Sequence, residues 1–113
     1  MSIINFTRQT SLATHTEIAD TPLKRLRGLL GRKALPVNHA LVIRPCQSIH
    51  MFFMRFAIDV IFLDKNQHVI GLCAHIKPFQ LSPIFWKSSC AIELSVGTID
   101  KTHTQIGDRI NIN

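Results

Sequence analysis

The chain has 113 residues, a length typical of one domain that buries its own hydrophobic core. Hydrophobic residues make up 46% of it and charged residues 18%, a balance that excludes an intrinsically disordered chain. Lysine and arginine outnumber aspartate and glutamate by 13 to 7, so the formal net charge is +6 and phosphate groups or anionic surfaces are natural partners. We expect a single domain over residues 1–113.

Cysteine usage and the absence of a leader indicate the compartment. The three cysteines, at positions 46, 73 and 90, are odd in number and form no Cys-x-x-Cys motif, which favours reduced thiols over disulfides. The first residues lack the basic start and apolar run of a signal peptide, and Asp59 and Asp64 interrupt the longest apolar run. The sequence therefore predicts a cytoplasmic protein without a membrane span, and it indicates no oligomeric state.

Segments with the composition and alternation of short β-strands occur throughout the chain. They lie at residues 2–7, 12–18, 40–43, 48–54, 58–63, 69–76, 91–96 and 109–112. The first two are expected to pair antiparallel through a turn near residues 8–10, and a turn at 64–67 should join 58–63 and 69–76 in a hairpin. Residues 48–54 are apolar on both faces, as in a strand covered on both sides. Residues 79–90 predict a long apolar loop, and residues 98–106 a short helix or turn.

One helix is expected over about residues 22–31. Thr21 and Pro22 are typical of a helix start, and Gly31 is typical of a helix end. Leucines at 23, 26 and 30 form one apolar stripe, which should pack on the core. Together these elements predict a mainly β (α+β) fold, a compact antiparallel barrel or sandwich of seven or eight short strands with this helix packed on it.

Four segments carry a resemblance to a known family. They are Leu26-Arg27-Gly28-Leu29-Leu30-Gly31-Arg32, the stretch from Ser48 to Asp64, Glu93-Leu94-Ser95-Val96-Gly97-Thr98, and Gly107-Asp108-Arg109-Ile110. In this order they are similar to the bacterial and archaeal family called domain of unknown function 192. The resemblance implies a small β-rich single domain and no established biochemical activity. The chain departs from the family at Ala57 and Val96, where relatives tend to have proline.

The segment from residue 46 to residue 64 places polar groups among apolar neighbours, where each of them costs free energy unless it is paired. Its candidate ligand-binding residues are His50, Phe53, Met54, Arg55 and Asp59. Asp59 should be buried and needs a partner, and Arg55 is the nearest candidate. Two interpretations remain open: a structural Arg55–Asp59 pair, or an arginine that recognises an anion and is oriented by Asp59.

His50 has two interpretations as well. Histidine titrates near neutral pH and so can act as a general base, or it can be a core histidine bonded to the backbone. No serine or cysteine motif near His50 resembles a nucleophile elbow, so the sequence does not support a hydrolase.

A basic cluster around the predicted helix provides candidate anion-binding residues. They are Lys24, Arg25, Arg27, Arg32 and Lys33. The alternative is a solvated helix face that keeps the protein soluble. No aromatic residue interleaves the cluster, which weakens a model of stacking on single-stranded nucleic acid.

Potential metal ligands are present, but their spacing is not that of a known site. Cys46 and His50 are four residues apart and Cys73 and His75 are two apart, which fits no zinc finger or ribbon. We expect no metal and no cofactor.

Three functions are compatible with these residues. The domain binds a small ligand or a protein partner near His50, Arg55 and Asp59, or it is an enzyme that uses His50 as acid and base. The third possibility is a protein that binds an anionic surface or nucleic acid through residues 24–33.

Overall fold

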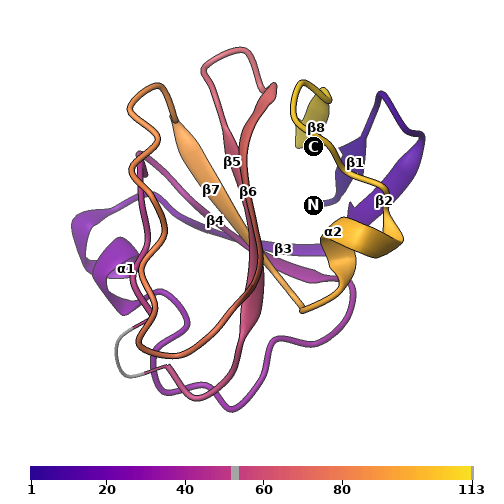
Figure 1. Cartoon of the computed structure of the whole chain (residues 1–113). Helices are drawn as coiled ribbons and strands as arrows, with labels where there is room; N and C mark the ends of the chain where they lie inside the picture. The colour runs from indigo at the N-terminus through magenta and orange to yellow at the C-terminus, as the bar shows by residue number, and fades with distance from the viewer. Residues whose placement is uncertain (52–53, 113) are drawn as a thin grey trace.

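The computed structural model describes residues 1–51 and 54–112, and its eight strands form two sheets (Figure 1). The smaller sheet has the order β2 (Thr10–Ala13), β1 (Ile3–Asn5) and β8 (Ile110–Ile112). The larger sheet has the order β3 (His15–Ala19), β4 (His39–Ile43), β7 (Cys90–Leu94), β5 (Ile58–Leu63) and β6 (Val69–Ile76). Two short helices, α1 (Pro22–Arg27) and α2 (Thr98–Lys101), complete the described part of the chain. A mainly β, sandwich-like fold is thus confirmed.

The predicted pairing of the first two strands is only partly correct. β1 and β2 pair antiparallel, but the predicted strand 12–18 is two strands that belong to different sheets. The chain crosses between the sheets at Thr14, where the amides of Thr14 and His15 both donate to the carbonyl of Asn38, at 2.9 and 3.0 Å. β3 then runs parallel to β4, while the other strand pairs are antiparallel.

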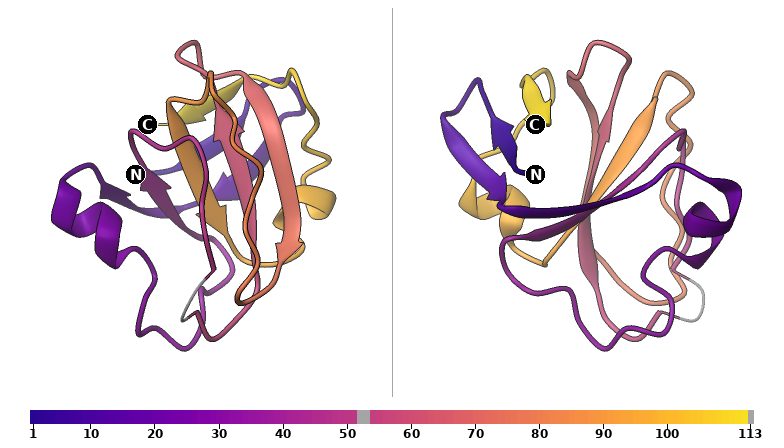
Figure 2. Two further views of the ribbon diagram at one scale, coloured as in Figure 1. Left: turned by 60° about the vertical axis from the view of Figure 1, so that its left-hand side comes forward. Right: turned by 180° about the vertical axis from the view of Figure 1, so that it is seen from behind.

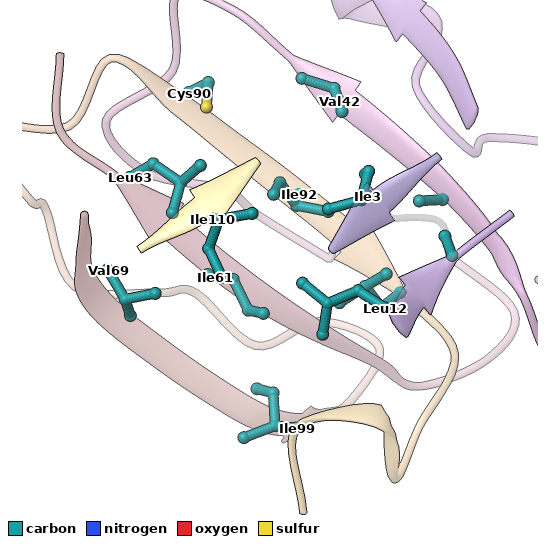
Figure 3. Close-up of a cluster of buried hydrophobic side chains, with 13 residues drawn as sticks. Ile3, Leu12, Val42, Ile61, Leu63, Val69, Cys90, Ile92, Ile99 and Ile110 are labelled. Carbon is teal, nitrogen blue, oxygen red and sulfur yellow. The ribbon is translucent and has the colours of Figure 1, made fainter. Parts of the chain in front are cut away.

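The main hydrophobic core fills the space between the two sheets (Figure 3). Ile3, Leu12 and Ile110 from the smaller sheet face Ile61 and Ile92 from the centre of the larger one. Every second residue of β5 and β7 contributes to this core, because successive side chains of a strand point to opposite faces. The remaining residues of these two strands face a second cluster, which is covered by loops and not by a sheet.

The helix α1 is shorter and more exposed than the leucine stripe predicts. It starts as expected, since Thr21 Oγ1 accepts a hydrogen bond from the amide of Lys24 at 3.2 Å. It ends at Gly28, whose φ of 47° is a conformation that glycine adopts readily. None of its residues is buried, and α1 projects from the side of the molecule (Figure 2). The prediction that Leu23 and Leu26 pack on the core is therefore wrong, because the helix ends before the stripe is complete.

The described part of segment 48–54 forms no strand, so this prediction is also wrong. His50 makes an isolated bridge with Leu81, and Met51 exchanges backbone hydrogen bonds with residues 79 and 80. The partner segment is a loop bounded by Pro78 and Pro83, which pairs too briefly to extend a sheet. The segment therefore covers the second cluster with the buried Ile49 and Met51 instead of joining a sheet.

Other predicted elements are confirmed. β5 and β6 form the expected hairpin, and its turn is held by Asp64, whose side chain accepts hydrogen bonds from the amides of Asn66 and His68. Residues 98–101 form the second helix, and the last strand is β8. Among residues 1–51 and 54–112, no helix is both long and apolar enough to cross a bilayer.

Candidate functional site

A pocket of about 690 Å³ lies between α1 and the loops that cover the outer face of the five-stranded sheet. In Figure 1 the helix and the orange loop before β7 border the same side of the molecule. Most of the pocket wall is apolar and includes Leu26, Leu29, Leu30, Ile43, Ile49 and Met54. Its polar side chains include Cys46, Ser48, His50, Ser88 and Glu93. This size, and an apolar wall with a few polar groups, are typical of a small-molecule site.

The inner wall of the pocket carries one buried carboxyl group, that of Glu93 on β7. This residue is opposite Leu41 of β4 and Val60 of β5 in the sheet, so its side chain is on the face covered by loops. Glu93 is only 6% exposed. Its Oε1 atom is fully buried and has no hydrogen-bond partner among residues 1–51 and 54–112. The only other buried side-chain nitrogen or oxygen atom without a partner in these residues is Thr16 Oγ1, which does not line this pocket.

Burial changes the chemistry of this carboxyl group. Removal from water raises the pKa of Glu93 from 4.5 to about 7, while the nearby positive charge of Arg32 opposes the shift. The protonated and ionised forms of Glu93 therefore coexist near neutral pH. A protonated carboxyl group can donate and accept hydrogen bonds, and a carboxylate attracts cationic donors.

Hydrogen bonds between two loops fix the shape of the pocket. Ser88 Oγ donates to the carbonyl of Cys46 at 2.7 Å, and Ser82 Oγ accepts from the amide of Ile49 at 2.8 Å. The amide of Phe85 donates to the carbonyl of Gln47 at 2.8 Å. The loops before β5 and before β7 are thus joined at three places.

The loop before β7 is also anchored on the sheet through Phe85. Its ring packs on Phe62 of β5, with ring centroids 4.6 Å apart. It also lies so close to Gly71 of β6 that a Cβ atom there would be 2.5 Å from the ring. Glycine at position 71 is therefore what allows the loop to approach the sheet and form one wall of the site.

The thiol in the pocket is not activated. Burial raises the pKa of Cys46 to about 11, against a smaller opposing effect of the Ser48 backbone. The thiol is therefore protonated at neutral pH, whereas a nucleophile or a metal ligand needs the thiolate. Within the described ranges, no three His, Cys, Asp or Glu side chains lie close enough together to hold a metal ion.

Asp59 is buried as predicted, but its predicted partner is wrong. The side chain is 1% exposed, and its two oxygens accept hydrogen bonds from the amides of His75 (2.8 Å), Gly97 (3.1 Å) and Ile99 (2.9 Å). Arg55 is exposed and forms no ion pair with it. Three backbone amides already stabilise the carboxylate, so it needs no arginine.

Only some of the predicted ligand-binding residues line the pocket. His50, which is exposed, and the buried Met54 line the pocket, whereas Arg55 and Asp59 do not. Phe53 lies outside the described residues. Whether any of them binds a ligand stays a prediction.

The residues of the basic cluster also have different surroundings. Arg25 and Arg27 line the pocket, and Lys24 and Lys33 are exposed. Arg32 binds Glu17, with 2.7 Å between Nη1 and Oε2.

Sequence reasoning missed Glu93 as a site residue. The available signal was one acidic residue in the apolar run Cys90-Ala91-Ile92-Glu93-Leu94, which became a strand with all five residues buried. A buried acid of this kind requires a partner or a function.

Comparison with known proteins identifies the family of this chain. The family model DUF192, described as "Uncharacterized ACR, COG1430", matches residues 3–112. The chain belongs to this family. A UPF0127 protein of Thermococcus sibiricus is 40% identical over 96% of the chain and 73% of the relative. A UPF0127 protein of Pyrococcus furiosus is 31% identical over 98% of the chain and 97% of the relative.

Two solved structures share the fold of this family member. A protein of unknown function from Novosphingobium aromaticivorans superposes with a TM-score of 0.84 and 17% identity, covering 98% of this chain and 82% of the other. A putative transcription regulator from Sinorhizobium meliloti superposes with a TM-score of 0.78 and 18% identity, covering 97% and 89%. At these identities the likeness concerns the fold alone.

Proposed function

We propose that this DUF192 domain binds a small organic ligand in the pocket between α1 and the loops, with the Glu93 carboxyl group as its polar anchor. The observation that carries the proposal is the buried Oε1 atom of Glu93, which has no partner in the described chain and belongs to a pocket of about 690 Å³. Burying a carboxyl group without a partner costs free energy. Proteins retain such a cost most often where function requires it.

The pocket wall indicates the chemistry of the ligand. Apolar residues such as Leu26, Ile43 and Ile49 favour a hydrophobic body, and Glu93 favours an N–H or O–H donor at its inner end. The guanidinium groups of Arg25 and Arg27 also border the pocket and can donate to polar groups elsewhere on the ligand. The ligand we expect is therefore an apolar or aromatic molecule with a hydrogen-bond donor at one end.

A set of four probes with the same ring and different polar groups tests this proposal: benzylamine, benzyl alcohol, benzoate and toluene. Binding is followed by backbone amide signals of Ile49, Trp86 and Leu94 in a two-dimensional NMR titration. We expect benzylamine and benzyl alcohol to bind more tightly than toluene. Benzylamine should bind more tightly as the pH rises from 6 to 8, because Glu93 then becomes ionised.

Glu93→Gln provides the decisive comparison, with Asp100→Asn as its matched control, since Asp100 is exposed on α2 and does not line the pocket. Benzylamine should bind at least fivefold more weakly to Glu93→Gln and without pH dependence, and normally to the control. The proposal is wrong if no probe shifts the pocket amides, or if benzylamine binds Glu93→Gln as it binds the wild type.

A further inference from the structure

An exposed surface of mixed apolar and basic side chains surrounds the mouth of the pocket. Its apolar members are Leu23 and Leu26 of α1 and Ile84 and Trp86 of the loop before β7, and its basic members are Lys24, Arg25, Arg27 and Lys87. We call this the α1 surface. Leu26, Ile84 and Trp86 all border the same pocket, so the helix and the loop contribute to one continuous surface.

The apolar residues of the α1 surface are unusually accessible. Leu23 is 75% exposed, Leu26 74% and Trp86 74%. Single exposed apolar residues are ordinary, but a group of them on one face marks a contact with another apolar phase. We propose that the α1 surface binds the surface of an anionic lipid bilayer.

The distribution of charge points to an anionic partner. Residues 21–58 and 65–92, which include both parts of the α1 surface, contain ten of the 13 basic residues and none of the seven acidic ones. Three acidic side chains belong to neighbouring parts of the chain: Asp20 precedes α1, Glu17 is bound to Arg32, and Glu93 is buried in the pocket wall, so it is not part of the exposed surface. Lysine and arginine on such a surface are attracted to acidic headgroups, and the apolar groups beside them enter the interface.

Other partners fit this composition less well. Lysine is depleted in protein–protein interfaces, whereas the α1 surface places a lysine next to Leu23 and another next to Trp86. A nucleic acid would use the cations, but its phosphate backbone offers nothing to two neighbouring leucines. A bilayer uses both kinds of side chain, and tryptophan is enriched at the level of its headgroups.

Trp86 makes the test direct, because it is the only tryptophan and the chain has no tyrosine. Its fluorescence is recorded with vesicles of phosphatidylcholine alone and with vesicles of phosphatidylcholine and phosphatidylglycerol in equal parts, alongside co-sedimentation. We expect a shift of emission to shorter wavelength and co-sedimentation with the anionic vesicles. Binding to phosphatidylcholine alone should be at least tenfold weaker, and salt should weaken binding to the anionic vesicles.

Two double variants separate the apolar from the electrostatic contribution. Leu23→Ser with Leu26→Ser, and Lys24→Glu with Arg25→Glu, should each reduce vesicle binding at least tenfold. Their thermal melts should stay normal, since none of these side chains is buried. The matched control, Ile106→Ser with Lys101→Glu, changes an exposed apolar and an exposed basic residue in and after α2 and should bind as the wild type does. Glu93→Gln should also bind normally, which makes this result independent of the pocket ligand.

Three results would overturn the proposal. The first is an absence of binding to the anionic vesicles. The second is a Trp86 shift that appears with protein concentration alone, which would assign the surface to self-association. The third is an equal shift with duplex DNA that survives the leucine substitutions, which would assign the cations to nucleic acid.

Discussion

Asp59 and Glu93 are both buried acids on neighbouring strands of one sheet, yet their surroundings differ completely. Asp59 is opposite Leu94 and Val60 is opposite Glu93, so the two acids occupy nearly the same level of the sheet and point to opposite faces. On one face of the sheet, Asp59 accepts hydrogen bonds from three backbone amides of the β6 and α2 regions. On the other face, one oxygen of Glu93 has no partner in the described chain.

The difference separates a structural carboxylate from a candidate functional one. The amides of His75, Gly97 and Ile99 belong to segments far apart in sequence, so Asp59 joins β6 to the start of α2. Such hydrogen bonds to a charged group are stronger than those between neutral groups. Glu93 Oε1 has no partner among the described residues, and the side chain lines a pocket, which is where a protein retains a costly group for a purpose other than stability.

Replacing Asp59 should cause the largest loss of stability. Asp59→Asn keeps the shape of the side chain but turns one acceptor oxygen into a donor that faces backbone N–H groups. We expect a loss of about 3–5 kcal/mol in the free energy of unfolding, the range for breaking a buried charged network. Urea unfolding measures it. Asp64→Asn is the matched control because Asp64 accepts two amides in a turn at the surface, and it should lose only about 1 kcal/mol.

Equal losses for the two variants would remove the structural role assigned to Asp59. If Asp59→Asn were as stable as the wild type, the three hydrogen bonds to Asp59 would not contribute to the stability of the fold.

This network shows where sequence reasoning succeeds and where it stops. The burial of Asp59 follows from its apolar neighbours Ile58 and Val60, and the hairpin around Asp64 follows from local turn chemistry. The partners of Asp59 lie 16 to 40 positions away along the chain. A backbone amide has no residue signature, so the sequence points to the nearest arginine, which is not the partner.

Two other errors have the same origin in long-range packing. A leucine stripe predicts burial only if another layer covers it, and the loops of this fold cover Leu29 while Leu23 and Leu26 remain exposed. Likewise, an apolar segment such as 48–54 becomes a strand only if a strand edge is available, and here its neighbour is a loop. The same segments form the pocket, so the sequence alone does not place Glu93 beside a cavity.

The pH dependence of stability should report the burial of the Glu93 carboxyl group. A carboxyl group whose pKa is raised in the folded state stabilises the fold fully below its unfolded pKa, and this contribution is lost as the pH rises through the folded pKa. For Glu93 the window runs from 4.5 to about 7. This shift in the pKa of Glu93 corresponds to about 3 kcal/mol at most in the free energy of unfolding.

We expect Glu93→Gln to gain stability relative to the wild type between pH 5 and pH 8, by roughly 2–3 kcal/mol, because a neutral amide carries no such dependence. Urea unfolding of both proteins at several pH values measures this difference, and the other titrating groups cancel in it. A difference that stays constant with pH would mean that Glu93 ionises like an exposed acid.

Gly71→Ala should test whether the loop that covers Glu93 is fixed on the sheet. The added methyl group would approach the Phe85 ring to 2.5 Å, so the ring and its loop must move away from Phe62. Overpacking of this kind costs about 1–3 kcal/mol. Thermal unfolding measures the loss. Phe85→Leu in the same background removes part of the ring and should restore some stability, and failure to do so would assign the cost to the backbone.

Arg55→Ala should have the smallest effect, and it separates the two interpretations of the Arg55–Asp59 constellation. If Arg55 were the partner of a buried carboxylate, removing it would leave Asp59 charged and unpaired, with a loss of about 3–5 kcal/mol. Because backbone amides bind Asp59 and Arg55 is exposed, we expect a change within about 0.5 kcal/mol. The double variant with Asp59→Asn should show additive effects, since the two side chains do not interact. A coupling energy above about 1 kcal/mol in this cycle would restore the ion pair and weaken the contrast between Asp59 and Glu93.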